Sequence, residues 1–262
     1  MRVRLLAFAL LIGVSAAAET RVGPSQGTLF IVGGGSMAKL WPEFLELAGG
    51  RDAPIVVIPT ANETIEANDH SAVALLALGA TQVTQLHTRD PKIADTEAFV
   101  APLRTARAIW ITGGRQWRLA DAYLDTRTLR EIFAVLARGG VVGGSSAGAS
   151  IQASYMVRGS PDGNTLMMAP GHERGFALLR DSAIDQHVNT RGRAEDLRPV
   201  LQAHPTLLGI ALDEATAIVV TGDRCRVVGV GAVRFFATPE AAPVVLSAGA
   251  RYDLATRQVA EE

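Results

Sequence analysis

Short apolar runs that end in glycine or polar residues recur along the first half of the chain. They occupy residues 28–32, 55–59, 108–112 and 140–143, and each is followed by a glycine-rich or polar cluster. A strand that is buried on both faces has a continuous apolar run, whereas a half-buried strand alternates apolar and polar positions. The pattern therefore predicts parallel strands of a sheet that is covered on both sides.

The segments between these runs have the spacing of amphipathic helices. Leu129, Ile132, Phe133 and Leu136 form one apolar stripe, and Gly139 follows it at the position of a C-terminal cap. Residues 72–78 have a similar stripe. Repeated units of strand, turn and helix predict an α/β fold, a three-layer, mostly parallel, doubly wound sheet. In such folds, ligands bind beyond the carboxyl ends of the strands.

The pattern changes after about residue 205. Strand-like runs at 208–212, 217–220, 225–230 and 233–236 follow one another at short spacing. Closely spaced strands with turns such as Gly-Asp and Gly-Ala favour an antiparallel extension of the same sheet. No linker rich in proline, serine or charge interrupts the sequence, so residues 19–262 are predicted to form a single domain.

The first residues have the three parts of a signal peptide. Arg2 and Arg4 are followed by an apolar run at 5–14 and by three alanines at 16–18. We expect residues 1–18 to be removed and the protein to be exported, to the periplasm or outside the cell. The run is too short to span a bilayer, and no later stretch approaches that length, so no membrane partner is expected.

Charge and cysteine content exclude several classes of function. The net charge is −1 and aromatic residues make up 5% of the chain, which argues against nucleic-acid binding. Cys225 is the only cysteine, so an intrachain disulfide cannot form, and its strand-like surroundings predict a buried thiol. No histidine or cysteine spacing suggests a metal site.

Residues 144–148 read Gly-Ser-Ser-Ala-Gly and match the Gly-x-Ser-x-Gly pattern centred on Ser146. Glycines on both sides of a serine permit a sharp strand-to-helix turn that exposes the hydroxyl group. The apolar run before the pattern and the helix-compatible residues after it support this interpretation. Ser145 lacks the symmetric glycines, so Ser146 is the candidate nucleophile of a hydrolase.

A nucleophilic serine needs a base and an acid that orients the base. Of the five histidines, His187 directly follows a strand-like run, which gives it a modest preference. Asp213 and Glu214 end the run at 208–212, and either could be the acid. The order serine, histidine, acid differs from that of α/β-hydrolases, which argues against a lipase or esterase.

Four motifs in register resemble the cyanophycinase family of serine peptidases, relatives of aspartyl dipeptidase on a glutamine-amidotransferase-like fold. These motifs lie at residues 113–116, 144–149, 185–193 and 212–217, and the resemblance extends from about residue 27 to beyond residue 220. It implies a catalytic triad of Ser146, His187 and Glu214, and oxyanion donors at Gly114 and Ala147. It implies no cofactor and no metal. The positions that would line the substrate site are Gln116, Asp185, Gln186, Arg191 and Arg193.

The activity that the resemblance implies is release of β-Asp-Arg dipeptides from cyanophycin, or from a related isopeptide, through an acyl-enzyme. An arginine pair suits a substrate with a free α-carboxylate. Two positions depart from the family: Arg115 replaces an Asp or Asn, and Asp196 replaces an arginine. A dipeptidase for α-Asp or isoaspartyl peptides and a non-catalytic binding protein on the same fold are the alternatives. Family members are often dimers, which makes a homodimer an expected assembly.

Overall fold

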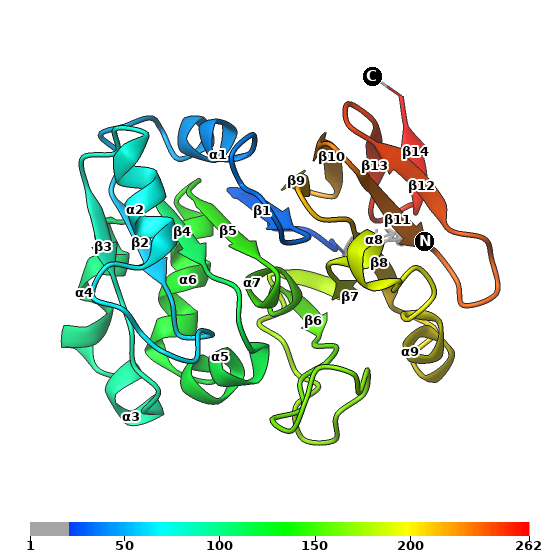
Figure 1. Cartoon of the computed structure of the whole chain (residues 1–262), viewed down its shortest axis with the longest axis horizontal. Coiled ribbons are helices and arrows are strands. Elements are labelled where there is room, and N and C mark those ends of the chain that lie inside the picture. Colours follow the sequence, from blue (N-terminus) through cyan, green and yellow to red (C-terminus); the bar gives the residue numbers. More distant parts are fainter. Residues whose placement is uncertain (1–20, 262) are drawn as a thin grey trace, which may run out of the picture.

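The computed structural model describes residues 21–261, and two β-sheets run through them (Figure 1). The predicted signal peptide, residues 1–18, lies outside the described residues. Within the described part, no helix is long and apolar enough to cross a membrane.

The larger sheet has a parallel half that matches the apolar runs of the sequence. Neighbouring strands in this half are parallel. When the strands are numbered along the chain, their order across the sheet is first, fifth, fourth, second and third. The predicted parallel strands are therefore confirmed, with ends that shift by one or two residues. They are β1 (Thr28–Val32), β2 (Ile55–Ile58), β4 (Ala108–Ile111) and β5 (Val141–Ser145), and the sheet also contains β3 (Val83–Gln85), which was not predicted.

Antiparallel strands extend this sheet beyond β1, as the C-terminal spacing predicts. They are β9 (Thr216–Thr221), β10 (Arg224–Gly229), β13 (Arg251–Asp253) and β14 (Gln258–Ala260). Strand β9 pairs with β1, and the full order among the described residues is β14-β13-β10-β9-β1-β5-β4-β2-β3. The predicted α/β fold, a mostly parallel sheet with an antiparallel extension, is confirmed.

A second sheet was not predicted. It contains β6 (Ala153–Tyr155), β7 (Leu179–Asp185), β8 (Leu208–Leu212), β11 (Ala232–Phe236) and β12 (Val244–Ser247). Its order is β12-β11-β8-β7-β6, with β6, β7 and β8 parallel. Residues 208–212 and 233–236 thus do not extend the larger sheet. A fully buried strand such as β8 has the same apolar run in either sheet, so the sequence pattern does not reveal its neighbours.

Helices cover both faces of the larger sheet. Alternate side chains of β1 point to opposite faces: Phe30 packs in a cluster with Trp41 and Phe44, while Ile31 packs in another with Ile132. The helices on the first face are α1 (Trp41–Leu47) and α2 (His70–Ala77). Those on the second face are α3 (Pro91–Ala94), α4 (Glu97–Thr105), α5 (Gln116–Tyr123) and α6 (Arg127–Ala137).

Two short helices follow strand ends: α7 (Ala147–Ser150) follows β5, and α8 (Val188–Arg191) follows β7. A third helix, α9 (Arg198–Ala203), follows α8 and lies at the lower right in Figure 1. The cluster that contains Ile31 also includes Ile210 of β8 and Phe235 of β11, so the two sheets share one apolar core. This shared core fixes the carboxyl ends of strands from both sheets relative to each other.

Candidate active site

Ser146 lies at the sharp turn between β5 and α7, as the sequence predicts. Its φ of 57° and ψ of −112° are outside the regions that residues with side chains favour. The Ser146 N–H donates to the carbonyl oxygen of Val32 at 3.1 Å, which ties the turn to the end of the neighbouring strand β1. The turn is thus fixed by the sheet, and the serine side chain is only partly buried.

The two glycines of the pattern are required by close backbone contacts. A Cβ atom at Gly144 would overlap the carbonyl oxygen of Gly148, and one at Gly148 would overlap the carbonyl oxygen of Ile111. Any larger residue would push α7 away from β5 or β4. The Gly-x-Ser-x-Gly spacing therefore has a steric cause in this fold.

His187 and Glu214 form a hydrogen-bonded chain with Ser146. The Nε2 atom of His187 lies 2.8 Å from Ser146 Oγ, and its Nδ1 atom lies 2.5 Å from Glu214 Oε1. When Nδ1–H donates to the carboxylate, Nε2 is free to accept the serine proton. The structure thus brings together the three residues of the predicted triad, and Glu214, not Asp213, reaches the histidine. Asp213 accepts from Arg234 instead.

The glycine loop after β1 packs against this chain. A Cβ atom at Gly34 would overlap the imidazole of His187, and one at Gly35 would lie 2.8 Å from Glu214 Cβ. The His187 N–H donates to the Gly33 carbonyl at 2.8 Å, which holds the histidine in a left-handed conformation with φ 57°. The glycine-rich segment after residues 28–32 is evident in the sequence, but its packing against the histidine and the acid was not predicted.

Two residues of α8, Asn189 and Thr190, position the acid, and no pattern in the sequence indicates either role. Thr190 Oγ1 donates to Glu214 Oε1 at 2.9 Å. The side-chain oxygen of Asn189 accepts from the Glu214 N–H at 2.9 Å. The carboxylate is therefore fixed from its backbone and from its side chain.

Local electrostatics keep the histidine neutral and the acid ionised. Burial lowers the pKa of His187 below its usual value, and the charges of Arg191 and Arg193 lower it further, while the bond to Glu214 opposes the shift. The hydrogen bond from His187 lowers the pKa of Glu214, and that from Thr190 acts in the same direction. A neutral imidazole beside a carboxylate is the state that a general base needs.

The predicted oxyanion donors lie on either side of the serine. Ala147 is the first residue of α7, so its N–H has no acceptor within the helix. A Cβ atom at Gly113 would lie 3.3 Å from Ser146 Cβ, which places the turn at 113–114 beside the nucleophile. Gly114 has a φ of +128°, and a Cβ atom there would overlap the Ala61 carbonyl oxygen. The role of the Gly114 and Ala147 N–H groups as oxyanion donors stays a prediction.

Most of the predicted substrate-binding residues are buried and bonded within the protein. Gln116 Nε2 donates to the Val157 carbonyl at 2.7 Å. Asp185 accepts from Arg158 through both oxygens, and the carbonyl oxygen of Gln186 accepts from Arg193 Nη1 at 3.1 Å. Arg191 is exposed. Among the five predicted substrate-binding residues, Arg191 is thus the exposed one. The binding roles of all five stay predictions.

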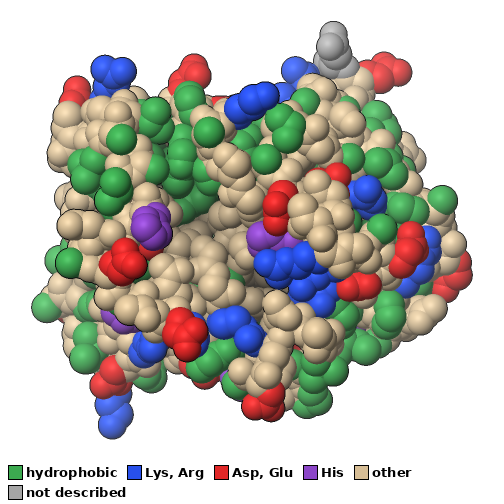
Figure 2. Space-filling view, viewed as in Figure 1, with side chains coloured by type: hydrophobic (Ala, Val, Ile, Leu, Met, Phe, Trp, Pro, Cys, Tyr) green, Lys and Arg blue, Asp and Glu red, His purple; other side chains and the backbone are tan. Residues whose placement is uncertain are grey.

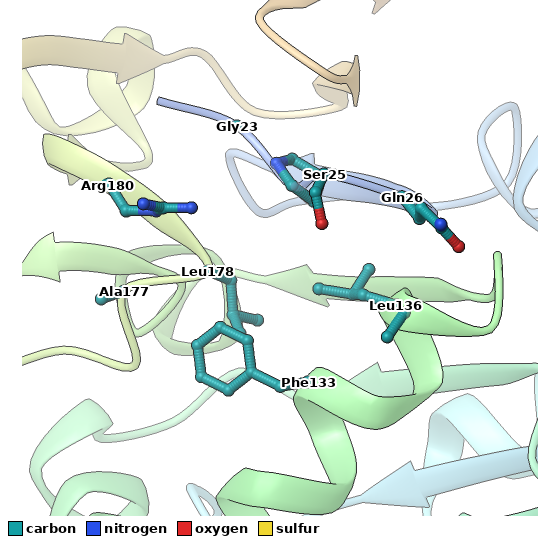
Figure 3. Close-up of a pocket in the computed structure, with 10 residues that line it drawn as sticks. Gly23, Ser25, Gln26, Phe133, Leu136, Ala177, Leu178 and Arg180 are labelled. Atoms are coloured by element: carbon teal, nitrogen blue, oxygen red, sulfur yellow. The ribbon is translucent and has the colours of Figure 1, made fainter. Parts of the chain in front are cut away.

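The surface around the site is hollowed. Figure 2 shows a hollow near the middle of the face, with histidine side chains on either side and lysine or arginine side chains beside one of them. A different cavity, of about 200 Å³, lies between residues 23–26 and α6, next to Leu178 (Figure 3). Arg180 is the only ionisable residue in the lining of that cavity, which therefore offers no base or acid for catalysis.

Comparisons with known proteins identify the family of the chain. The model of Peptidase family S51 matches residues 29–228. A cyanophycinase from Geminocystis herdmanii is 32% identical over 194 residues, which cover 72% of this chain and 71% of that protein. A cyanophycinase from Nostoc sp. is 30% identical over 225 residues, which cover 82% of this chain and 75% of that protein.

Two solved structures have a similar fold. A peptidase from an acI-B1 Actinobacterium matches with a TM-score of 0.70 and 23% identity, over 88% of this chain and 98% of that one. A putative peptidase E protein from Listeria monocytogenes matches with a TM-score of 0.59 and 20% identity, over 78% and 99%. On the extent of the family match and the identity to its relatives, the chain belongs to peptidase family S51 and is a serine-type peptidase.

Proposed function

We propose that the protein is a cyanophycinase-like peptidase that releases β-Asp-Arg dipeptides from cyanophycin, or from a related isopeptide, through an acyl-enzyme. The observation that carries the proposal is the hydrogen-bonded chain from Ser146 through His187 to Glu214. The names of the relatives, each a cyanophycinase, support the choice of substrate.

The first half of the reaction forms the acyl-enzyme. Ser146 Oγ attacks the carbonyl carbon of the scissile amide while His187 Nε2 takes the hydroxyl proton. The N–H groups of Gly114 and Ala147 donate to the oxyanion that develops on the carbonyl oxygen. His187 then gives its proton to the leaving nitrogen, the C–N bond breaks, and the amine departs. The acyl group remains on Ser146 as an ester.

The second half releases the acid product. A water molecule attacks the ester carbonyl and His187 takes its proton. The protonated histidine then returns that proton to Ser146 Oγ as the C–O bond breaks, and a carboxylic acid leaves. Glu214 holds the imidazole in one tautomer and stabilises its positive charge in both halves.

Substrate orientation would come from Arg191, which is exposed. Arg193 is buried and donates to the Gln186 carbonyl, so it contributes through its charge. A guanidinium can hold a substrate carboxylate through two parallel hydrogen bonds. A peptide with a free α-carboxylate next to a β-linked amide fits this arrangement.

Product analysis tests the proposal. The protein is incubated with purified cyanophycin, and the soluble products are identified by mass spectrometry. The expected product is β-Asp-Arg, and Ser146→Ala should yield none. If the wild-type protein leaves cyanophycin intact but hydrolyses α-Asp or isoaspartyl dipeptides, the alternative of a dipeptidase replaces the proposal. Absence of turnover on all of these substrates would favour a binding protein.

A further inference from the structure

A loop between β6 and β7 connects the two halves of the candidate active site. Its residues 157–164, here called the bridging loop, contain no helix or strand. The loop lies in the green to yellow-green segment that hangs below β6 in Figure 1. It is held by hydrogen bonds from both sides of the site.

The first set of bonds comes from the turn that carries the predicted oxyanion donor. Arg115 Nη2 donates to the carbonyl oxygens of Ser160 at 2.5 Å and of Gly163 at 2.6 Å. The adjacent Gln116 Nε2 donates to the Val157 carbonyl at 2.7 Å. Since Gly114 directly precedes Arg115, the bridging loop and the oxyanion turn are fixed to each other.

The second set of bonds connects the loop to the strand that ends at His187. Arg158, which is 2% exposed, donates through Nε and Nη2 to the two oxygens of Asp185, each at 2.9 Å. Its Nη2 also donates to Asp196 Oδ2 at 2.5 Å, and its Nη1 donates to the Asn164 carbonyl at 2.9 Å. One guanidinium thus binds two carboxylates and the far end of the loop.

Arg115 and Asp196 are the two positions at which the chain departs from the resemblance, and both act on the same loop. We propose that they are positioning residues that clamp the bridging loop between the oxyanion turn and the end of β7, and that neither contacts the substrate. The expected changes in kcat and KM rest on the proposed peptidase function. The expected change in the stability of the bridging loop rests on the hydrogen bonds alone.

The clamp changes which charges are available to a substrate. The guanidinium of Arg115 is engaged with two main-chain carbonyls, and the carboxylate of Asp196 is paired with Arg158. Recognition of a carboxylate would therefore be left to Arg191, because the guanidinium of Arg193 is buried and donates to the Gln186 carbonyl. We expect the site to bind substrates with one carboxylate near the scissile bond. Charged substrate groups close to Arg115 or Asp196 should not change the affinity.

Kinetics on two substrates distinguish a clamp from direct contact. The variants are Arg115→Met, Asp196→Ala and the double variant. Each is assayed with a soluble cyanophycin fragment and with the same fragment carrying leucine in place of each arginine. A displaced oxyanion turn should lower kcat in Arg115→Met by about ten- to hundredfold on both substrates alike. Asp196→Ala should mainly raise KM, by the same factor for both substrates, because it loosens the opposite end of the loop.

Coupling between the two positions gives a second kinetic criterion. Residues that act through one shared element have non-additive effects. The double variant should therefore lose no more kcat/KM than the worse single variant. Additive losses, or a loss confined to the arginine-bearing fragment, would overturn the proposal in favour of separate substrate contacts.

Hydrogen exchange tests the clamp independently of turnover. Peptides that cover residues 157–164 should exchange faster in Arg115→Met and in Asp196→Ala than in the wild-type protein. The control variant Arg130→Met breaks the exposed ion pair with Asp95 on α6 and α3 and should leave both exchange and kinetics unchanged. Unaltered loop exchange in both site variants would refute the clamp, even if no β-aspartyl peptide proves to be a substrate.

Milder variants keep the test available if Arg115→Met does not fold. Arg115→Lys retains the charge but not the planar guanidinium, and Asp196→Asn retains the shape but not the charge. Each should accelerate exchange of residues 157–164 by less than the corresponding larger change. Exchange equal to that of the wild-type protein in both would contradict the proposal.

Discussion

Ser146 and the residues in contact with it are held in backbone conformations that carry strain. Ser146 and His187 both have φ near 57°, and a conformation of this kind costs roughly 1–3 kcal/mol. The hydrogen bonds to Val32 and Gly33 hold them there. In these conformations, Ser146 Oγ and the His187 imidazole lie on the same side of the strand ends and within hydrogen-bond distance of each other.

Thr190 is expected to support catalysis through Glu214. Thr190→Val removes the hydrogen bond to Glu214 Oε1, so the carboxylate loses one of its fixed donors, and kcat should fall about tenfold. Thr190→Ser keeps the hydroxyl group and should remain close to the wild-type rate. Steady-state kinetics on one peptide substrate compare the two, and equal activity of Val and Ser variants would refute the role of the hydroxyl.

The pH dependence of kcat/KM should report the charge of Arg191. This cation lowers the pKa of His187, so its removal should raise that pKa. The histidine is active as a base only when neutral, so the acid limb of the profile should move to higher pH in Arg191→Met. Arg191→Lys keeps the charge and should leave the limb in place. A limb that stays fixed, or moves to lower pH, in Arg191→Met contradicts the electrostatic account.

Among the elements, the end of β7 depends on a buried ion pair. Asp185 is completely buried and binds Arg158 through both oxygens, just before Gln186 and His187. Removal of the Asp185 charge leaves the buried guanidinium of Arg158 with Asp196 as its remaining carboxylate partner, and this loss inside the protein costs more than loss of an exposed pair. The strand end that carries the histidine is therefore expected to be sensitive to this position.

Asp185→Asn should destabilise the protein by about 3 kcal/mol. The matched control is Asp95→Asn, which weakens an exposed pair with Arg130 and should cost less than about 1 kcal/mol. Urea unfolding monitored by circular dichroism gives both free energies of unfolding. An equal decrease in the free energy of unfolding of the two variants would show that the buried Asp185 pair contributes no more stability than an exposed pair.

The sequence predicted individual strands and helices better than it predicted the contacts between distant parts of the chain. The continuous apolar runs gave β1, β2, β4 and β5, because burial on both faces leaves a clear pattern. The stripe on α6 gave the helix, although Phe133 is 41% exposed. Arg158 had no signal at all, because its partners Asp185 and Asp196 are 27 and 38 residues away and no local rule connects them.

At the scale of the molecule, the candidate triad is assembled from two sheets. Ser146 follows β5 of the larger sheet, whereas His187 and Glu214 follow β7 and β8 of the smaller one. The chain crosses from the smaller to the larger sheet at Glu214, between β8 and β9. A single sheet was expected. The motifs in register identified the residues, but the sequence did not predict the architecture that brings them together.

The strand ends and the family motifs together explain why the triad was predictable. Ser146, His187 and Glu214 each follow the carboxyl end of a strand, where the general rule for open α/β sheets places ligands. The positioning groups Thr190, Asn189 and Gly34 were not predictable, because their role depends on distances between loops that the sequence does not encode locally. The homodimer and the export of the protein stay predictions.

Covalent trapping of Ser146 is the most direct test of the central claim. The protein is incubated with a fluorophosphonate, digested, and analysed by mass spectrometry to find the modified residue. The account predicts one adduct, on Ser146, with loss of peptidase activity in proportion to labelling, and neither adduct nor activity in Ser146→Ala. Labelling at another residue, or peptidase activity retained by Ser146→Ala, would contradict it.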